Sequence, residues 1–370
     1  MKKYKLTAML LSLALIMSMV LTACGSKRDD EQTGNNGSNN ASTGNEVWEQ
    51  TFEADGNEYP SMTIGLATMG NMNDIAATPG CQGFALFKNY MEGKSGGKIK
   101  VEIYDNSVLG SDEDMLEQVA QNSVQITTPM TSGLLTYDTE FGALDLPFLF
   151  ASSDQAIAAM NGEVGEYFKS ALDSSTGLTI AGYYYNGARS MTNNVRPITC
   201  VDDMKGLKMR VMNSDTYVKL MQALGANPTP ISWNELFTAM QQGTVDGEEN
   251  PPSTIYPSGF AEVQKYFSKT EHVFGYAAVV VSSAFYNGMD DASRKLFDEG
   301  IELLTSTADK AELEIGDAYI AKMAEAGMEC NDITPENKQG FIDATASVRD
   351  EYRSVYSAEL WGILDKVTAN

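Results

Sequence analysis

The residues of this chain best suited to chemistry are two arginines, each close to a stretch that is typical of a β-strand. Arg189 follows the apolar residues 178–185, and Arg210 lies near the end of residues 207–211. A guanidinium has a rigid fork of N–H donors that matches a carboxylate bidentately. Because ligands of open α/β sheets bind outside the carboxyl ends of strands, the two arginines predict a site for an anionic small molecule. The alternative is that each forms a surface ion pair with one of the 50 acidic residues.

Composition excludes several other classes of function. The chain has 370 residues and a formal net charge of -24, whereas binding to duplex nucleic acid requires clustered Lys and Arg. His272 is the only histidine, so a histidine-rich metal site cannot form and a Ser-His or Cys-His nucleophile would depend on this one residue. We therefore expect neither an enzyme of these kinds nor a metal or cofactor.

The elements that must position the arginines alternate between strand and helix. Alternating or continuous apolar residues predict strands over 62–67, 98–104, 124–127, 178–185, 207–211 and 276–282. Cap and breaker residues predict helices that start at Ser111 (with Asp114 completing a capping box), Ser214, Ser232 (with Glu235 completing a second box), Asp290 and Thr334. The helix that starts at Asp290 extends to about residue 326 as one long or broken helix. This order predicts an α/β fold with a parallel or mixed sheet.

The N-terminus has the features of an export signal. Lys2, Lys3 and Lys5 precede an apolar run that is too short to span a membrane and ends in Leu21-Thr22-Ala23-Cys24. This ending resembles the bacterial lipobox, so we expect a signal peptide over 1–23 and a diacylated Cys24 that anchors the protein to the membrane. The alternative is an ordinary signal peptide with an incidental cysteine. Residues 24–60 would then form the anchor, a disordered tether and a lead-in.

The other three cysteines are Cys81, Cys200 and Cys330. Their number is odd and their spacing matches no metal or redox motif, so at most one intramolecular disulfide could form. We expect three largely buried free thiols.

The stretch 225–251 is the most specific part of the sequence. It contains Gly225-Ala226-Asn227-Pro228-Thr229-Pro230 and Ala239-Met240-Gln241-Gln242-Gly243-Thr244-Val245-Asp246-Gly247-Glu248-Glu249-Asn250-Pro251. With these motifs the chain resembles the DctP-type solute-binding proteins of tripartite ATP-independent periplasmic (TRAP) transporters. Supporting motifs occur in the family's order across residues 62–370: Ser95-Gly96-Gly97-Lys98-Ile99, Asp145-Leu146-Pro147-Phe148, Asn186-Gly187-x-Arg189, Lys205-Gly206-Leu207-Lys208-x-Arg210 and Glu262-Val263-Gln264-Lys265-Tyr266.

The resemblance implies a fold and a domain division. It implies a two-domain periplasmic-binding-protein-like (flytrap) fold with mixed sheets, crossing strands and a long domain-spanning helix. Domain I would comprise 61–186 plus about 276–310, and domain II would comprise 187–275 plus about 311–370. The two domains would close on a ligand held in the cleft between them.

The resemblance also implies a function and a ligand-binding set. The protein would capture a small organic acid outside the cytoplasm and deliver it to the small and large membrane subunits of a TRAP transporter. Arg210 would pair with the ligand carboxylate, Arg189 would assist, Asn250 would donate a hydrogen bond, and Trp233 would lie against the carbon skeleton. Alternatively, Trp233 belongs to the core and Asn250 caps the turn into Pro251.

One departure from the family narrows the range of ligands that the chain is expected to bind. Members that bind a sialic acid have an acidic residue after the strand that corresponds to 124–127, where this chain has Pro129-Met130-Thr131. Dicarboxylates, uronates, other sugar acids and 2-oxo acids remain open as ligands. Asp112, Tyr183 and Tyr184 are further candidates for polar contacts with the ligand.

Two other classes of function also remain: an envelope enzyme acting on carboxylated sugars, and a sensory or adhesive lipoprotein that binds a protein partner.

Overall fold

Two long antiparallel strands, β4 and β8, form the middle of the sheet in the computed structural model, which describes residues 46–172 and 176–369. In these residues nine strands form one mixed sheet in the order β2-β1-β3-β8-β4-β7-β5-β6, and β9 pairs with β8. The strands are β1 (Met62–Ala67), β2 (Ile99–Tyr104), β3 (Ile126–Thr127), β4 (Leu178–Asn193), β5 (Lys208–Val211), β6 (Asn227–Pro230), β7 (Gly247–Asn250), β8 (Tyr266–Ser282) and β9 (Glu329–Asp332).

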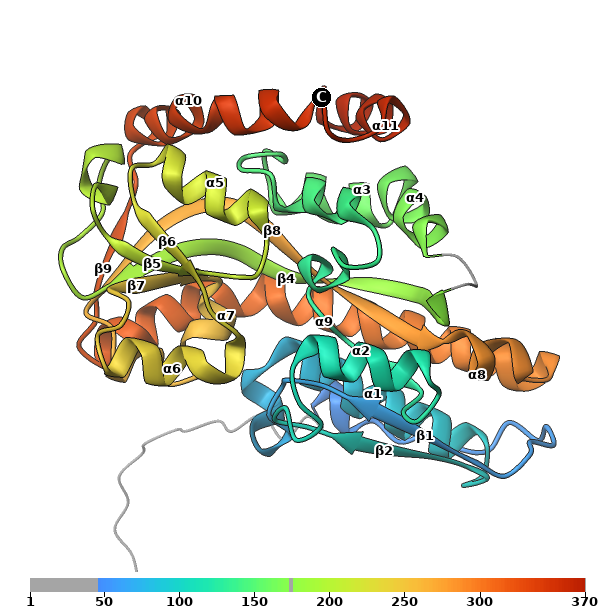
Figure 1. The fold of residues 1–370 in the computed structure, drawn as a ribbon. Coiled ribbons are helices and arrows are strands. Elements are labelled where there is room, and N and C mark those ends of the chain that lie inside the picture. The colour runs from blue at the N-terminus through green and yellow to red at the C-terminus, as the bar shows by residue number, and fades with distance from the viewer. Residues whose placement is uncertain (1–45, 173–175, 370) are drawn as a thin grey trace, which may run out of the picture. The chain divides into compact units, whose positions relative to one another are not determined.

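Helices cover both faces of this sheet, with α9 on one side of β4 and β8 and α10 and α11 on the other (Figure 1). The helices are α1 (Pro79–Lys94), α2 (Asp112–Ala120), α3 (Ser153–Met160), α4 (Glu163–Ala171), α5 (Asp215–Ala223), α6 (Trp233–Gln241), α7 (Pro252–Ile255), α8 (Ser283–Gly288), α9 (Asp291–Glu325), α10 (Pro335–Tyr352) and α11 (Ala358–Thr368). Short 3-10 helices lie at Val47–Glu49, Met72–Ala77, Thr131–Leu134, Thr139–Asp145, Val201–Met204 and Phe260–Glu262.

The central strands are buried on both faces because their successive side chains enter different cores. Tyr183 and Tyr185 of β4 belong to the hydrophobic cluster that includes residues of α10 and α11, whereas Tyr184 between them belongs to the cluster that includes residues of α1 and α9. This period of two is the geometry of a β-strand. It explains why residues 276–282 form a continuous apolar run, as predicted for a strand covered on both sides.

Several predicted elements are confirmed at their boundaries. The strand over 62–67 is β1, and the Ser111–Asp114 capping box opens α2, with the Asp114 amide donating to Ser111 Oγ over 3.2 Å. The long helix is continuous as α9, which contacts α1, β4, α7 and β9. Thr334 caps α10 through a hydrogen bond from the Asn337 amide.

Several predictions about local structure are wrong. The strand predicted over 276–282 is only the last part of β8, which begins at Tyr266. Ser232 precedes α6, but its side chain makes no cap hydrogen bond, so Ser232 and Glu235 do not form a capping box. The strand predicted over 178–185 continues to Asn193, because β4 absorbs the Asn186-Gly187 dipeptide as an irregularity between Tyr185 and Gly187. Gly187 has φ +103°, a conformation that glycine adopts at little cost.

The predicted thiols are free within the described residues, although only Cys81 is fully buried, and Cys200 and Cys330 are half-buried.

The predicted signal peptide, Cys24 and most of the tether lie outside the described residues. No helix among residues 46–172 and 176–369 has the length and apolar character needed to cross a membrane. The predicted division into two domains stays a prediction.

The contact between β4 and β7 generates a prediction about Gly247. A Cβ at Gly247 would lie 1.9 Å from the Thr192 carbonyl oxygen, which is backbone and cannot move aside. We expect Gly247→Ala to lower the free energy of unfolding by about 1–3 kcal/mol, measured by chemical denaturation. The matched control is Gly316→Ala in α9, where a Cβ meets nothing within 4 Å. This control should stabilise the fold by about 0.5–1 kcal/mol, and equal effects of the two changes would contradict the prediction.

Candidate functional site

A cavity of about 670 Å³ brings together the four predicted ligand-binding residues, which come from four different elements. Arg189 lies in β4, Arg210 in β5, Trp233 at the start of α6 and Asn250 at the end of β7. The strands β4, β7 and β5 are neighbours in the sheet, so their side chains reach one region although the residues are far apart in sequence. A single concave site with a few convergent polar groups is the usual form of a small-molecule pocket.

The position of Arg189 differs from the prediction. It does not follow the end of its strand but lies inside β4, where Arg189 pairs with Val273 of β8. The reason is the irregularity at Gly187, through which β4 continues beyond Tyr185 to Asn193. The side chain is 1% exposed, which also excludes a surface ion pair.

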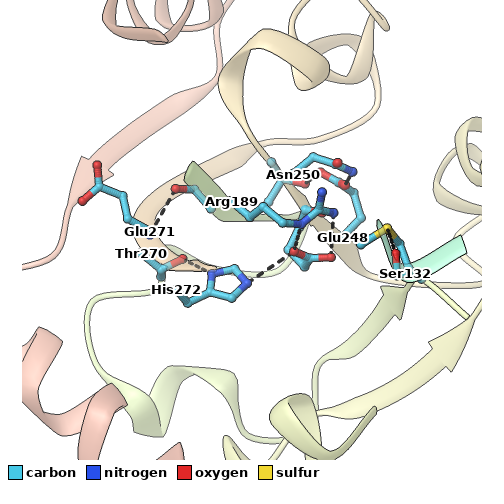
Figure 2. A network of polar contacts seen from close by, with 11 residues as sticks. Ser132, Arg189, Glu248, Asn250, Thr270, Glu271 and His272 are labelled. Carbon is cyan, nitrogen blue, oxygen red and sulfur yellow. Dashed lines mark hydrogen bonds and ion pairs between the residues drawn. The ribbon is translucent and has the colours of Figure 1, made fainter. Parts of the chain in front are cut away.

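Arg189 forms a buried ion pair with Glu249 of β7. Its Nε and Nη2 donate to the two carboxylate oxygens of Glu249 over 2.6 and 2.9 Å, and Nη2 also donates to the Glu249 carbonyl. His272 Nε2 lies 3.3 Å from the same carboxylate, and Thr270 Oγ1 lies 2.8 Å from His272 Nδ1. Figure 2 shows the Arg189 and His272 side chains pointing toward one carboxylate group.

The electrostatics of this pair follow from its burial. Burial alone would raise the pKa of Glu249, but Arg189 and His272 outweigh it and lower that pKa to about 2. Burial would likewise lower the pKa of Arg189, and the charge of Glu249 reverses this and raises it. Both groups therefore stay ionised, and each neutralises the other.

Glu248 lies beside this pair and is also fully buried. It accepts hydrogen bonds from Thr192 Oγ1 over 3.1 Å and from Asn250 Nδ2 over 2.5 Å (Figure 2). Burial, reinforced by the charge of Glu249, raises the pKa of Glu248 to about 7. The carboxyl group of Glu248 is therefore only partly ionised at neutral pH, and it holds the amide of Asn250 in place.

Arg210 is as deeply buried as Arg189 but is not neutralised. It is 3% exposed, and its Nε donates to the Ile231 carbonyl over 2.9 Å. Within the described part of the chain Arg210 forms no ion pair and no other side-chain hydrogen bond. Burial lowers its pKa to about 10, although Glu248 and Glu249 oppose this shift. The guanidinium is still protonated at neutral pH, so the cavity contains a positive charge with unused donors.

Trp233 and Asn250 both line the cavity, where the predicted ligand contacts would be made. Trp233 is half-buried and packs against Phe260, with ring centroids 5.5 Å apart, while it also lines the cavity. Asn250 ends β7 immediately before Pro251, and it too lines the cavity. Neither residue is confined to the core or to a turn.

The additional candidates separate into two groups. Asp112 and Tyr184 line the cavity, whereas Tyr183 is absent from its lining and packs in the core close to Gly165 of α4. No group of three or more His, Cys, Asp or Glu side chains is arranged to hold a metal ion in the residues that the structure describes.

Sequence reasoning missed the acid that pairs with Arg189 and the two titratable groups beside that pair. Glu248 and Glu249 are part of the quoted motif, and His272 is the only histidine, but none of the three was assigned to the site. One available signal was two consecutive acids in a strand-like stretch, because burial of a carboxylate demands a cation nearby. The pairing itself joins residues 60 positions apart and needs the sheet order to be known.

Comparison with known proteins places this geometry in a family. Residues 71–355 match the model of the bacterial extracellular solute-binding protein family 7, named DctP. The C4-dicarboxylate-binding periplasmic protein DctP of Rhodobacter capsulatus is 31% identical over 294 residues, which cover 79% of this chain and 88% of that protein.

Solved structures agree with the sequence relatives. The sugar acid binding protein of Advenella mimigardefordensis in complex with galactonate matches with a TM-score of 0.79 and 28% identity, covering 84% of this chain and 99% of that one. A TRAP periplasmic solute-binding protein of Shewanella oneidensis with bound succinate matches with a TM-score of 0.78 and 27% identity, covering 84% and 100%. These matches confirm the predicted α/β fold of the flytrap type.

Proteins of this family bind small carboxylate ligands outside the cytoplasm and work with membrane subunits; they are transport proteins and not enzymes. The chain is thus a member of the DctP family, the family 7 extracellular solute-binding proteins of TRAP transport systems.

Proposed function

We propose that this protein captures a small organic acid by pairing the ligand carboxylate with Arg210 and delivers it to TRAP membrane subunits. The observation that carries the proposal is the buried guanidinium of Arg210, which has no carboxylate partner among the described residues. A buried charge is costly unless it is paired and hydrogen-bonded. A ligand carboxylate in the cavity would supply both the charge and the acceptors.

Arg189 and Asn250 support this pairing in different ways. The fork of Arg189 is occupied by Glu249, so we propose that it assists through its fixed position and its remaining donor. Asn250 uses one amide hydrogen toward Glu248, which leaves the second for the ligand. Trp233 offers an aromatic surface to the ligand's carbon skeleton.

Delivery requires that the protein release what it binds. We propose that the two predicted domains close on the ligand, because contacts made only in the closed state shift the population toward it. Docking to the membrane subunits would then favour the open state. A lipid anchor on Cys24 would keep the protein at the extracytoplasmic face of the cell membrane.

The first prediction from the proposed function concerns ligand binding by Arg210. We expect Arg210→Ala to weaken binding at least about 100-fold, because a desolvated carboxylate loses its cation. Thermal shift and calorimetry with succinate, malate, galactonate and galacturonate measure this loss for whichever acid the parent protein binds most tightly. The control is Arg353→Ala, which removes an exposed arginine paired with Asp365. Unchanged affinity in Arg210→Ala would refute the site.

A second prediction contrasts the stability of two variants without ligand. We expect Arg189→Ala to lower the free energy of unfolding by about 3–5 kcal/mol, because it leaves the Glu249 carboxylate buried with only His272 beside it. Arg210→Ala should change it by less than about 1 kcal/mol, since no buried acid loses an ion-pair partner. Chemical denaturation distinguishes the two, and an equal loss in both variants would contradict the different roles given to them.

The third prediction tests the anchor. We expect Cys24→Ser to move the protein from the membrane fraction to the soluble fraction and to abolish incorporation of labelled fatty acid, because the thiol that carries the lipid is gone. Cys200→Ser serves as the control thiol and should change neither measurement. A Cys24→Ser protein that stays in the membrane fraction would show that another segment anchors it.

A further inference from the structure

The cavity contains very little positive charge for a site that binds an anion. Among the described residues that line it, Arg189 and Arg210 are the only cationic side chains, with no lysine or histidine. Arg189 is neutralised by its ion pair with Glu249. One uncommitted cation, Arg210, therefore remains, which is enough to pair with one carboxylate.

The part of the lining that comes from residues 68–133, called the wall below, carries acids and neutral polar groups. Its acidic members are Asp74, Asp112 and Glu113. Its neutral members have amides or hydroxyls and include Thr68, Asn71, Thr128 and Ser132. Thr68, Thr128 and Ser132 are themselves buried, so these hydroxyls are held in place around the cavity.

Asp112 has an unused hydrogen-bonding atom in this wall. Its Oδ1 is shielded from solvent and has no hydrogen-bond partner in the part of the chain that the structure describes. Burial, reinforced by Glu113, raises the pKa of Asp112 to about 8, so its carboxyl group is largely protonated at pH 7. Such a group donates one hydrogen bond and accepts others, as does a ligand hydroxyl, and in neither protonation state does it supply positive charge.

A second ligand carboxylate would be poorly accommodated at this wall. It would lose hydration beside a largely protonated Asp112 and the exposed acids Asp74 and Glu113 without gaining a cation, and a buried charge left unpaired is unfavourable. Ligand hydroxyls, in contrast, can pair with the amides, the hydroxyls and Asp112. The volume of about 670 Å³ also leaves room for a longer, hydroxylated carbon chain.

We propose that the ligand is a polyhydroxylated monocarboxylic acid, such as an aldonate or a uronate, and not a dicarboxylate. The inference rests on the proposed function of Arg210 and adds the class of molecule that the remaining wall selects. The carboxylate lies against Arg210, and the hydroxyls extend toward residues 68–133.

The experiment compares six-carbon acids that differ in the number of carboxylates and hydroxyls, together with two four-carbon dicarboxylates. Calorimetry on the full chain, purified in a mild detergent, measures affinity for galactonate, gluconate, galacturonate, glucuronate, galactarate, hexanoate and also succinate and malate. We expect at least one of the first four to bind, and galactarate, hexanoate, succinate and malate to bind at least 100-fold more weakly. Galactarate has the carbon skeleton of galactonate with a second carboxylate, and hexanoate lacks the hydroxyls.

The outcomes separate this inference from the proposed function. Binding of succinate, malate or galactarate as tight as that of the best monocarboxylate would overturn the inference and leave the role of Arg210 standing. Equal binding of hexanoate would overturn the part assigned to the hydroxyls. A protein that binds none of these acids overturns the proposed function, and the inference with it.

A charge introduced into the wall tests the reason for the selectivity. We expect Asp112→Lys to reduce the ratio of the dissociation constants of galactarate and galactonate at least tenfold, because the second carboxylate gains a cation. The matched control is Asp154→Lys, which makes the same change of charge in the first turn of α3, outside the cavity lining. Glu113→Lys, at an exposed position of the lining, replaces Asp112→Lys if that variant does not fold. An unchanged ratio in the variant that folds would overturn the charge argument.

Discussion

The buried ion pair between Arg189 and Glu249 is the interaction on which the site depends. It joins the central strand β4 to the short strand β7 in a region where neither residue is more than 1% exposed. Because each charge would be costly without the other, the pair holds the two strands together at this point. It also neutralises the charge of one of the two arginines, which among the described residues of the cavity lining leaves Arg210 as the charge available to a ligand.

This arrangement explains how a strongly acidic protein can bind an anion. The net charge of -24 is a property of the whole chain, and interactions with distant surface charges are screened by salt within about 10 Å. Inside the cavity the local balance of charge decides the binding, and there the described residues leave one guanidinium, that of Arg210, without a carboxylate partner. A weakly acidic Glu248 and a largely protonated Asp112 reduce the negative charge that the ligand would otherwise meet.

The sequence indicated the elements better than it indicated their contacts. Strand β1, the Ser111 cap of α2 and the long helix α9 follow from local signals, namely apolar periodicity, a capping residue and the lack of breakers. The turn-like Asn186-Gly187 dipeptide was misleading, since glycine serves equally well in a turn and in an irregular strand. Arg189 was therefore placed after a strand in which it is in fact included.

By itself the sequence determined the α/β class, the family, the export signal expected at the N-terminus and the residue types of an anion site. Only the tertiary structure decided which arginine is neutralised, because that depends on Glu249, which reaches Arg189 from the neighbouring strand β7. Exposure of a charge and the identity of its partner are properties of side chains brought together from distant parts of the chain. Periodicity and motifs describe a residue's own neighbours along the sequence, and so they could identify Arg189 and Arg210 but could not distinguish their roles.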